Sequence, residues 1–277
     1  MLPPEGRRTS SPGALRRWVA AHTDDRAIRL LRAAAYRATA VLHTEDHNPA
    51  TNGELRVLRC LASDARVLLD VGAHDGAWAL TAAQACPEAV IHCLEIASPT
   101  RALLRERVGH HPRIVVADHG LLDTSGITRV KYYRGDDRLS SVVDYPHGYT
   151  GDWLEERVET GDQYLARAGL NHVDLLKVDA EGADLRVLHG FDEALSDGRV
   201  RAVQFEYGYA GVLSGALLER FYALLEPRGY VIGRVLPERV LFRQYRLSDE
   251  RFFGPNFLAV RRCDDLWRLV EGASRRR

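Results

Sequence analysis

The chain has 277 residues, of which 45% are hydrophobic and 27% are charged, a composition typical of a globular protein with one substantial core. Its 38 basic and 38 acidic side chains cancel, so the overall charge gives no reason to expect nucleic acid or an anionic membrane as a partner. The residues contain no apolar run of membrane-spanning length and no secretory signal at the start. The cysteines are scattered without zinc-like spacing, so we expect free thiols and a cytoplasmic protein.

The N-terminal part is expected to be a helical appendage. Residues 1–12 are rich in proline, glycine, serine and arginine, which is typical of a loose tail. Apolar residues then recur at three- and four-residue spacing over about 13–42, which predicts helix, and 43–53 have the composition of a loop. We therefore expect a tail and appendage over 1–53, a main domain over 54–265 and a C-terminal tail over 266–277. The amphipathic pattern of the appendage would also suit a homodimer contact.

Strand and helix patterns alternate through the main domain, beginning with a helix over 54–62. This alternation predicts an α/β fold with a Rossmann-like, doubly wound, mostly parallel sheet. The last strands have the pattern of antiparallel strands that finish the sheet. Strands are expected at 66–71, 90–95, 113–117, 128–133, 173–179, 201–206, 229–235, 239–243 and 256–261, and helices at 76–86, 99–108, 160–169, 183–189 and 214–227.

A glycine turn follows the first strand of the main domain. The strand ends at Asp70, and Gly72 and Gly76 follow before a helix begins. Such a turn leaves backbone N–H groups free at the helix start, where a nucleotide-like ligand can approach without meeting side chains. The dinucleotide pattern G-x-G-x-x-G is not met, because residue 74 is His74 and no glycine stands at residue 77. An ordinary strand–turn–helix connection is the alternative.

The next two strands also end in polar residues. Glu95 ends the second strand, 25 residues after Asp70, where a carboxylate can accept hydrogen bonds from both hydroxyls of a ribose. A phosphate on that ribose would be repelled. The third strand is followed by Asp118 and His119, a position suited to an adenine edge. Each acid alone would also suit a helix cap or a solvated turn.

The sequence Asp174-Leu-Leu-Lys177-Val-Asp179-Ala-Glu181-Gly-Ala-Asp184 is the most distinctive segment of the chain. A lysine and two acids within five residues are costly on a buried strand unless they pair or face a ligand. Strand alternation places Lys177, Asp179 and Glu181 on about the same side. The alternative is a structural ion pair of Lys177 with a neighbouring acid, together with a helix cap.

The glycine turn, Glu95 and the 174–184 segment together resemble the FkbM family of S-adenosylmethionine-dependent, class I methyltransferases, over about residues 52–261. The segment Asn52-Gly-Glu54 is similar to one found ahead of the glycine turn in some members, whereas His74 and Asp75 depart from the family pattern. The resemblance implies that Gly72, Ala73, His74 and Gly76 line the methionine part of the cofactor, oriented by Asp70. It also implies that Glu54 belongs to the cofactor site, that Glu95 holds the ribose, that Asp118 and His119 border the adenine, and that Asp179 lies near the transferred methyl group.

The resemblance further implies an O-methyltransferase acting on a hydroxyl of a sugar, a glycolipid or a polyketide or related natural product. Asp179 or Glu181 would accept the hydroxyl proton, and Lys177 would hold the acid or stabilise the developing alkoxide. Glu206, at the end of a later strand, could join Asp179 around a divalent cation, although carboxylates are common at strand ends and the cation is not the favoured interpretation.

The acceptor side of the site is expected in the polar and aromatic segment 138–149, as a lid or acceptor wall, with an anchored surface loop as the alternative. Two other functions stay open. A nicotinamide dehydrogenase is disfavoured by the missing third glycine, and a non-catalytic cofactor-binding protein by the intact strand-end acids. We expect a small-molecule partner, no nucleic acid and no membrane span.

Overall fold

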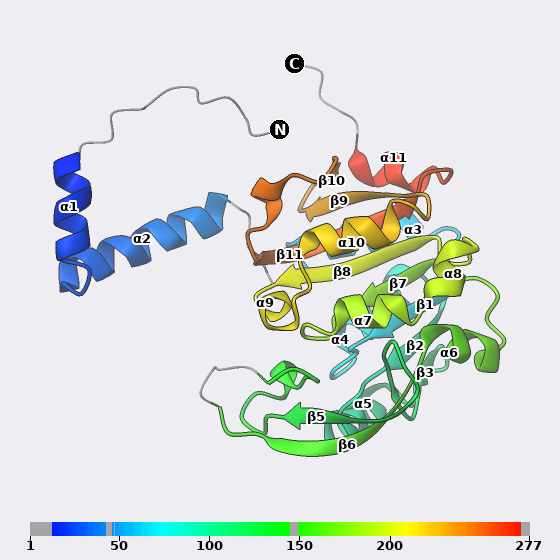
Figure 1. Ribbon diagram of the computed structural model, residues 1–277. Helices are drawn as coiled ribbons and strands as arrows, with labels where there is room; N and C mark the ends of the chain where they lie inside the picture. Colours follow the sequence, from blue (N-terminus) through cyan, green and yellow to red (C-terminus); the bar gives the residue numbers. More distant parts are fainter. Residues whose placement is uncertain (1–12, 43–45, 47, 145–148, 273–277) are drawn as a thin grey trace. The chain divides into compact units, whose positions relative to one another are not determined.

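The structure is a computed structural model that describes residues 13–42, 46, 48–144 and 149–272. It divides the chain into two compact units, residues 1–45 and 46–277. The first unit contains two helices, α1 (Gly13–Ala21) and α2 (Arg26–Leu42). Both lie in the stretch where apolar spacing predicts helix. The second unit contains all the strands of the described residues (Figure 1).

An eight-stranded sheet forms the centre of the second unit, in the order β10-β9-β11-β8-β7-β1-β2-β3. The adjacent strands β8, β7, β1, β2 and β3 run parallel to one another. In contrast, β11 runs antiparallel to both of its neighbours, β8 and β9. The predicted Rossmann-like, class I methyltransferase fold with antiparallel C-terminal strands is therefore confirmed. The strands are β1 (Val67–Val71), β2 (Val90–Leu94), β3 (Ile114–Val116), β7 (Leu175–Val178), β8 (Ala202–Gly208), β9 (Tyr230–Leu236), β10 (Arg239–Phe242) and β11 (Phe253–Arg261).

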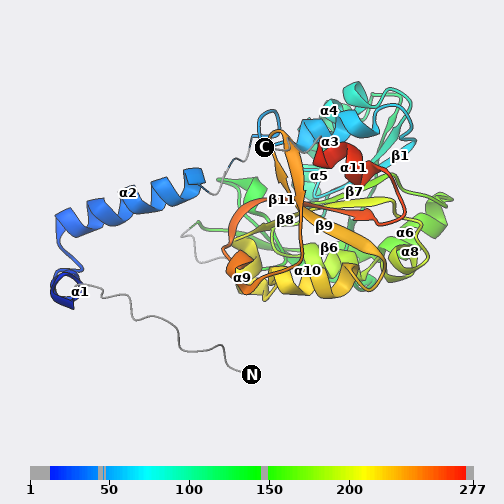
Figure 2. The same cartoon turned by 90° about the horizontal axis from the view of Figure 1, so that it is seen from above.

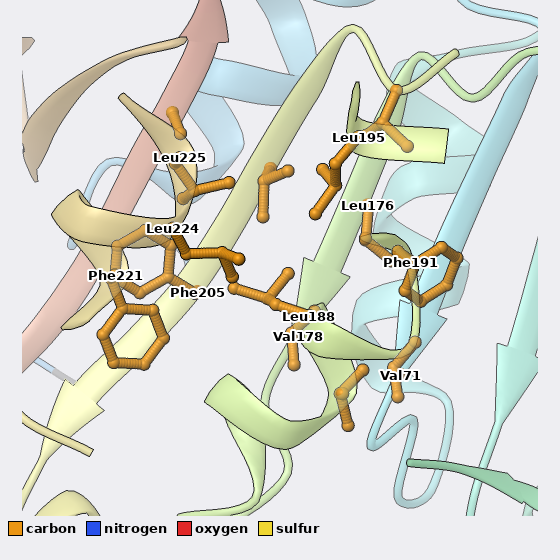
Figure 3. Packing of buried hydrophobic residues seen from close by; sticks show 14 of the residues in the cluster. Val71, Leu176, Val178, Leu188, Phe191, Leu195, Phe205, Phe221, Leu224 and Leu225 are labelled. Atoms are coloured by element: carbon orange, nitrogen blue, oxygen red, sulfur yellow. The ribbon is translucent and has the colours of Figure 1, made fainter. Parts of the chain in front are cut away.

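Helices cover both faces of this sheet, and each face has its own hydrophobic cluster (Figures 1 and 2). On one face, Phe205 of β8 stacks on Phe221 with ring centroids 4.3 Å apart, as Figure 3 shows. That cluster is completed by α6 (Gly161–Ala168), α7 (Asp184–His189), α8 (Asp192–Ser196) and α10 (Leu218–Leu225). The opposite face is covered by α3 (Glu54–Leu61), α4 (Ala77–Ala85), α5 (Ser98–Val108) and α11 (Leu266–Glu271).

The helix α11 lies in the stretch that is expected to be a C-terminal tail. It buries Leu266 and Val270 against the sheet, and Leu266 N–H is capped by Asp264 Oδ1 at 2.8 Å. The remaining short helix of this unit is α9 (Ala210–Ser214). Among the described residues, none of the helices is long and apolar enough to cross a membrane.

A second, three-stranded sheet follows β3 in the chain, in the order β4-β6-β5. Its strands are β4 (Gly120–Leu121), β5 (Gly126–Tyr132) and β6 (Asp152–Glu159). In its described residues, the connection between β5 and β6 contains one 3-10 turn, η1 (Asp137–Leu139). This connection returns to the main sheet and reaches the candidate site, as described below.

Candidate active site

The candidate site lies at the carboxyl edge of the parallel strands. Asp70 is in β1, Glu95 directly follows β2, Asp179 directly follows β7, and Glu206 is in the second half of β8. Because parallel strands end at a common edge, four acids that are far apart in the sequence come together there. The structure therefore gathers the predicted strand-end acids on the side where open α/β sheets bind ligands.

The glycine turn is shaped by a close approach of two backbone segments. Gly72 has φ +81°, and a Cβ atom there would lie 1.8 Å from the carbonyl oxygen of Asp179. Gly76 has φ +79°, and its Cβ would lie 2.6 Å from a methyl group of Val108. Both positions thus require glycine for space as well as for backbone conformation. The loop after β7 is held directly against the turn.

Lys177 joins the acids of β1 and β7. Its Nζ lies 3.1 Å from Asp70 Oδ1 and 3.2 Å from Asp179 Oδ2, and the lysine is 6% exposed. Burial opposes the lysine charge, but the attraction of Asp179 and Asp70 outweighs it and raises the pKa of Lys177 above its ordinary value. The ion pair that was one interpretation of this segment is therefore present.

The second carboxylate oxygen of Asp70 is not satisfied by the protein. Asp70 is fully buried, and its Oδ2 has no hydrogen-bond partner among the described residues. Burial raises the pKa of Asp70, with Lys177 acting in the opposite direction. A buried acceptor without a donor is costly, and a ligand that carries a donor would remove that cost.

Three carboxylates form a cluster beside Lys177, at the ends of β7 and β8. One oxygen each of Asp179, Glu181 and Glu206 lies within 4.8 Å of the others. Burial, followed by the charges of Asp179 and Asp184, raises the pKa of Glu181 to about 8. Burial, followed by the charges of Asp179 and Glu181, raises the pKa of Glu206 well above its ordinary value. Such a group of oxygens can share protons or hold a hard divalent cation.

Asp184 supports this cluster from the start of α7. Its Oδ1 accepts from the N–H of Ala180 at 3.1 Å, and its Oδ2 accepts from the N–H of Gly182 at 3.0 Å. These bonds fix the loop in which Glu181 has φ +47°, a conformation uncommon for a residue with a side chain. Burial and then Asp179 raise the pKa of Asp184 to about 7. The helix cap that was an alternative interpretation of this segment is not formed, because Ala183 occupies the N-cap of α7 without a side-chain hydrogen bond, and Asp184 instead orders the loop before the helix.

Glu95 is bound to the glycine turn. Its Oε2 accepts from the backbone N–H of His74 at 3.0 Å, and its Oε1 accepts from the N–H of Ala97 at 2.9 Å. Burial raises the pKa of Glu95, and the two backbone hydrogen bonds oppose this effect. Each oxygen has a further lone pair, so the carboxylate can still accept hydrogen bonds from a ligand.

Glu54 is held by three amide side chains. Its Oε1 accepts from Asn52 Nδ2 at 2.7 Å and from Asn256 Nδ2 at 2.8 Å, and its Oε2 accepts from Gln204 Nε2 at 2.9 Å. The carboxylate is thus satisfied within the protein and joins the start of α3 to β8 and β11. Sequence reasoning found Asn52 and Glu54 but missed Gln204 and Asn256. A glutamine inside the apolar run of β8 was the available signal.

The β5–β6 connection crosses the site between the glycine turn and the acidic cluster. Asp137 Oδ1 lies 3.0 Å from His74 Nε2, and Asp137 Oδ2 accepts from Thr100 Oγ1 at 3.1 Å. Further along, Ser141 is 1% exposed and its Oγ donates to the carbonyl oxygen of Glu181 at 2.6 Å. We call residues 137–143 the strap. Asp137 was missed by sequence reasoning, which placed the candidate acceptor segment at 138–149; residues 145–148 lie outside the described part of the chain.

Asp118 and His119 follow β3 as expected, and both side chains are engaged by the protein. Asp118 pairs with Arg105, and its side chain is 83% exposed. His119 is buried, with Nε2 lying 2.6 Å from Glu159 Oε1. Burial lowers the pKa of His119, whereas Glu159 acts in the opposite direction. Their role at an adenine ring stays a prediction.

Comparison with known proteins adds the family. Residues 70–232 match the model of the methyltransferase FkbM domain. The 2-O-methyltransferase NoeI of Sinorhizobium fredii (strain NBRC 101917 / NGR234) is 28% identical over 166 residues, which cover 54% of this chain and 67% of NoeI. The AMB antimetabolite synthetase AmbE of Pseudomonas aeruginosa is 28% identical over 163 residues, which cover 46% of this chain and 8% of AmbE.

Solved structures with a similar arrangement were also found. The O-methyltransferase from Bacillus cereus in complex with SAH has a TM-score of 0.43 and 15% identity, covering 89% of this chain and 96% of that chain. The TehB-like SAM-dependent methyltransferase from Corynebacterium glutamicum has a TM-score of 0.40 and 14% identity, covering 87% and 97%. The family assignment rests on the domain match, which spans more than half of the sequence: the chain belongs to the FkbM methyltransferase family.

Proposed function

We propose that this protein is an S-adenosylmethionine-dependent O-methyltransferase that methylates a hydroxyl group of a small molecule. The observation that carries the proposal is the unsatisfied Oδ2 of Asp70, at the end of a strand and beside the glycine turn. The printed name of the relative NoeI, a 2-O-methyltransferase, supports transfer to oxygen. Sugars, glycolipids and polyketide-like natural products are the proposed acceptor classes.

The residues present fit the cofactor. Asp70 Oδ2 would accept a hydrogen bond from the ammonium of its methionine part, which satisfies the buried acceptor. The close approach of the Gly72 backbone to the carbonyl oxygen of Asp179 places the turn beside the acidic cluster, where that part would lie. Glu95 would accept from the ribose hydroxyls with its remaining lone pairs. When bound, the cofactor supplies a methyl group that is already electrophilic, so the protein's main tasks are alignment and removal of one proton.

We assign Asp179 as the base that accepts the proton of the acceptor hydroxyl. Lys177 Nζ lies 3.2 Å from Asp179 Oδ2 and favours the ionised form of this carboxylate by direct charge attraction. In our proposal Asp179 takes the hydroxyl proton of the acceptor, while Glu181 donates one hydrogen bond to the hydroxyl oxygen, whose other lone pair attacks the methyl group. The pKa of Glu181 is raised to about 8, so this side chain carries a proton near neutral pH. Lys177 acts as a positioning residue for Asp179.

A divalent cation at Asp179, Glu181 and Glu206 is an alternative use of the same oxygens, which lie within 4.8 Å of one another. The proposed mechanism does not use it, because shared protons can balance the cluster. Turnover that persists after treatment with EDTA would support the proton mechanism. Turnover that EDTA abolishes and Mg²⁺ restores would replace it with a metal-assisted one.

Calorimetry with S-adenosylmethionine, S-adenosylhomocysteine and NAD tests the cofactor assignment. We expect both S-adenosyl compounds to bind and NAD not to bind; binding of NAD alone would refute the proposal. Methyl transfer is then measured as S-adenosylhomocysteine release with a panel of sugars, glycolipids and polyketides. Asp179→Asn should lower the rate at least about a hundredfold, the usual contribution of general base catalysis. Asp265→Asn is the matched control, because this side chain is 81% exposed on the start of α11.

A further inference from the structure

The helix α2 has two chemically different sides. At about 100° for each residue, its four arginines fall within an arc of about 140°. The opposite arc contains Leu30, Leu31 and several alanines. The arginines are Arg26, Arg29, Arg32 and Arg37, and the helix contains no acidic residue. Basic side chains on one face and leucines on the other are typical of helices that lie in a membrane interface.

Two leucines on the apolar side of α2 are exposed, whereas Ile28 on the same side is buried. Leu30 and Leu31 are 64% and 63% exposed, far more than the leucines of the main sheet. In the neighbouring helix α1, Trp18 is 50% exposed. Single exposed apolar residues are normal, but two adjacent leucines on an amphipathic helix form a surface that favours burial.

The zero net charge of the chain hides a separation of charge. Residues 13–42 contain six arginines and two aspartates. The whole chain has 38 basic and 38 acidic side chains, so the residues outside this segment carry 32 basic and 36 acidic ones. The expectation from overall charge, that an anionic surface is no partner, does not apply to the helical unit by itself.

An anionic bilayer fits both faces of α2 at once. Phosphate groups pair with the arginines, and the acyl-chain boundary accepts Leu30 and Leu31. A second copy of α2 would bury the leucines but leave the arginines of both helices unpaired on the outer faces, because the helix has no acid to pair with them. A nucleic acid would pair with the arginines and leave the leucines in water. The helix has 17 residues and lies below the length of a span, which suits the surface.

We propose that α2 binds the surface of an anionic lipid bilayer, with Leu30 and Leu31 inserted and the four arginines at the headgroups. This binding is independent of the methyltransferase chemistry. It would hold the catalytic unit at a membrane, where a lipid-linked acceptor would be concentrated. The attraction between arginines and headgroups predicts that salt weakens binding.

Sedimentation of the full chain with vesicles tests the proposal. The vesicles contain either phosphatidylcholine alone or three parts phosphatidylcholine to one part phosphatidylglycerol. We expect binding to the mixed vesicles at low salt, weaker by about tenfold or more without phosphatidylglycerol or at high salt. Leu30→Ser with Leu31→Ser, and Arg29→Glu with Arg32→Glu, should each lower the affinity by about tenfold or more.

The matched controls lie outside α2. Leu213→Ser removes a leucine that is 47% exposed on α9, and Arg220→Glu reverses an arginine with a 65% exposed side chain on α10. Both should bind mixed vesicles like the wild type, and circular dichroism verifies that every variant is folded. Unchanged binding of the leucine variant would overturn the proposal, as would failure of the wild type to sediment. Concentration-dependent dimers that the leucine variant abolishes would assign the face to a second copy instead.

Discussion

Replacing Lys177 with methionine removes the cation that joins the two sides of the site. Methionine keeps an unbranched side chain of similar length, so packing changes little. In the wild type the Lys177 ammonium lies 3.1 Å from Oδ1 of the fully buried Asp70, and the substitution removes it. The carboxyl must then stay charged in a buried position or take up a proton.

The expected cost depends on pH. Breaking a buried ion pair by removing one partner costs about 3–5 kcal/mol. Keeping a proton on Asp70 costs about 1.4 kcal/mol for each pH unit above its ordinary pKa of 3.8. Because the raised pKa favours the protonated folded form, stability is kept at low pH and lost as pH rises. We expect a loss of about 2 kcal/mol at pH 5 and about 4 kcal/mol at pH 8.

Urea unfolding, followed by circular dichroism at these two pH values, measures the effect. Lys131→Met is the matched control, because Lys131 lies 4.0 Å from a half-exposed Asp144 and should cost less than about 1 kcal/mol. Adding Asp70→Asn to Lys177→Met should recover at least half of the loss, since the amide is neutral. A loss that does not change with pH, or a loss below about 1 kcal/mol at pH 8, would refute this electrostatic account.

Four further outcomes are expected. Gly72→Ala places a Cβ 1.8 Å from a backbone oxygen and should abolish binding of S-adenosylhomocysteine in calorimetry. The control is Gly215→Ala, where φ is +73° but the space is open, and it should lower the stability by only about 1–2 kcal/mol. The raised pKa of Glu181, about 8, should cost the wild type up to about 5 kcal/mol of folding stability as pH rises from 4.5 to 8, so its melting temperature should fall over that range. Glu181→Gln removes the titrating group and should make this fall smaller. Asp137→Asn should weaken S-adenosylhomocysteine binding about threefold to tenfold by loosening His74; unchanged affinity would show that the strap does not position the turn. The cationic S-adenosylmethionine should gain affinity over neutral S-adenosylhomocysteine as pH rises to about 8, because the fraction of ionised Glu181, which attracts a positive ligand, grows over that range; a constant ratio in calorimetry would contradict this.

The central sheet could be predicted because its strands are continuous apolar runs with both faces buried. The runs at 66–71 and 173–179 contain β1 and β7, and the run at 201–206 lies within β8 apart from its first residue. The strand β6 was missed, since its sequence DWLEERVE alternates charged and apolar residues weakly and its first half is exposed. Such a strand is specified by its antiparallel partner β5 rather than by its own pattern.

Site residues could be predicted where an acidic residue stands at the end of a predicted strand. Asp70, Glu95 and Asp179 were found in this way. The partners of these acids were not, because they come from distant parts of the chain: Asn256 and Glu54 are 202 residues apart. Asp137 lies in an exposed, polar connection, and only the fold of the second sheet returns it to the glycine turn.

The arrangement of charge links the stability of the site to its proposed ligand. Lys177 pairs with two acids, and Glu181, Glu206 and Asp184 lie close enough that like charges raise their pKa values. Buried acids in excess of buried cations are costly, and proteins relieve that cost with protons or positive ligands. A sulfonium next to Asp179 would supply such a charge only while the methyl group is attached. Transfer removes this charge while Asp179 gains the hydroxyl proton. Once Asp179 releases that proton to solvent, the acids that favour binding of the cationic donor no longer favour the neutral product, which promotes its release.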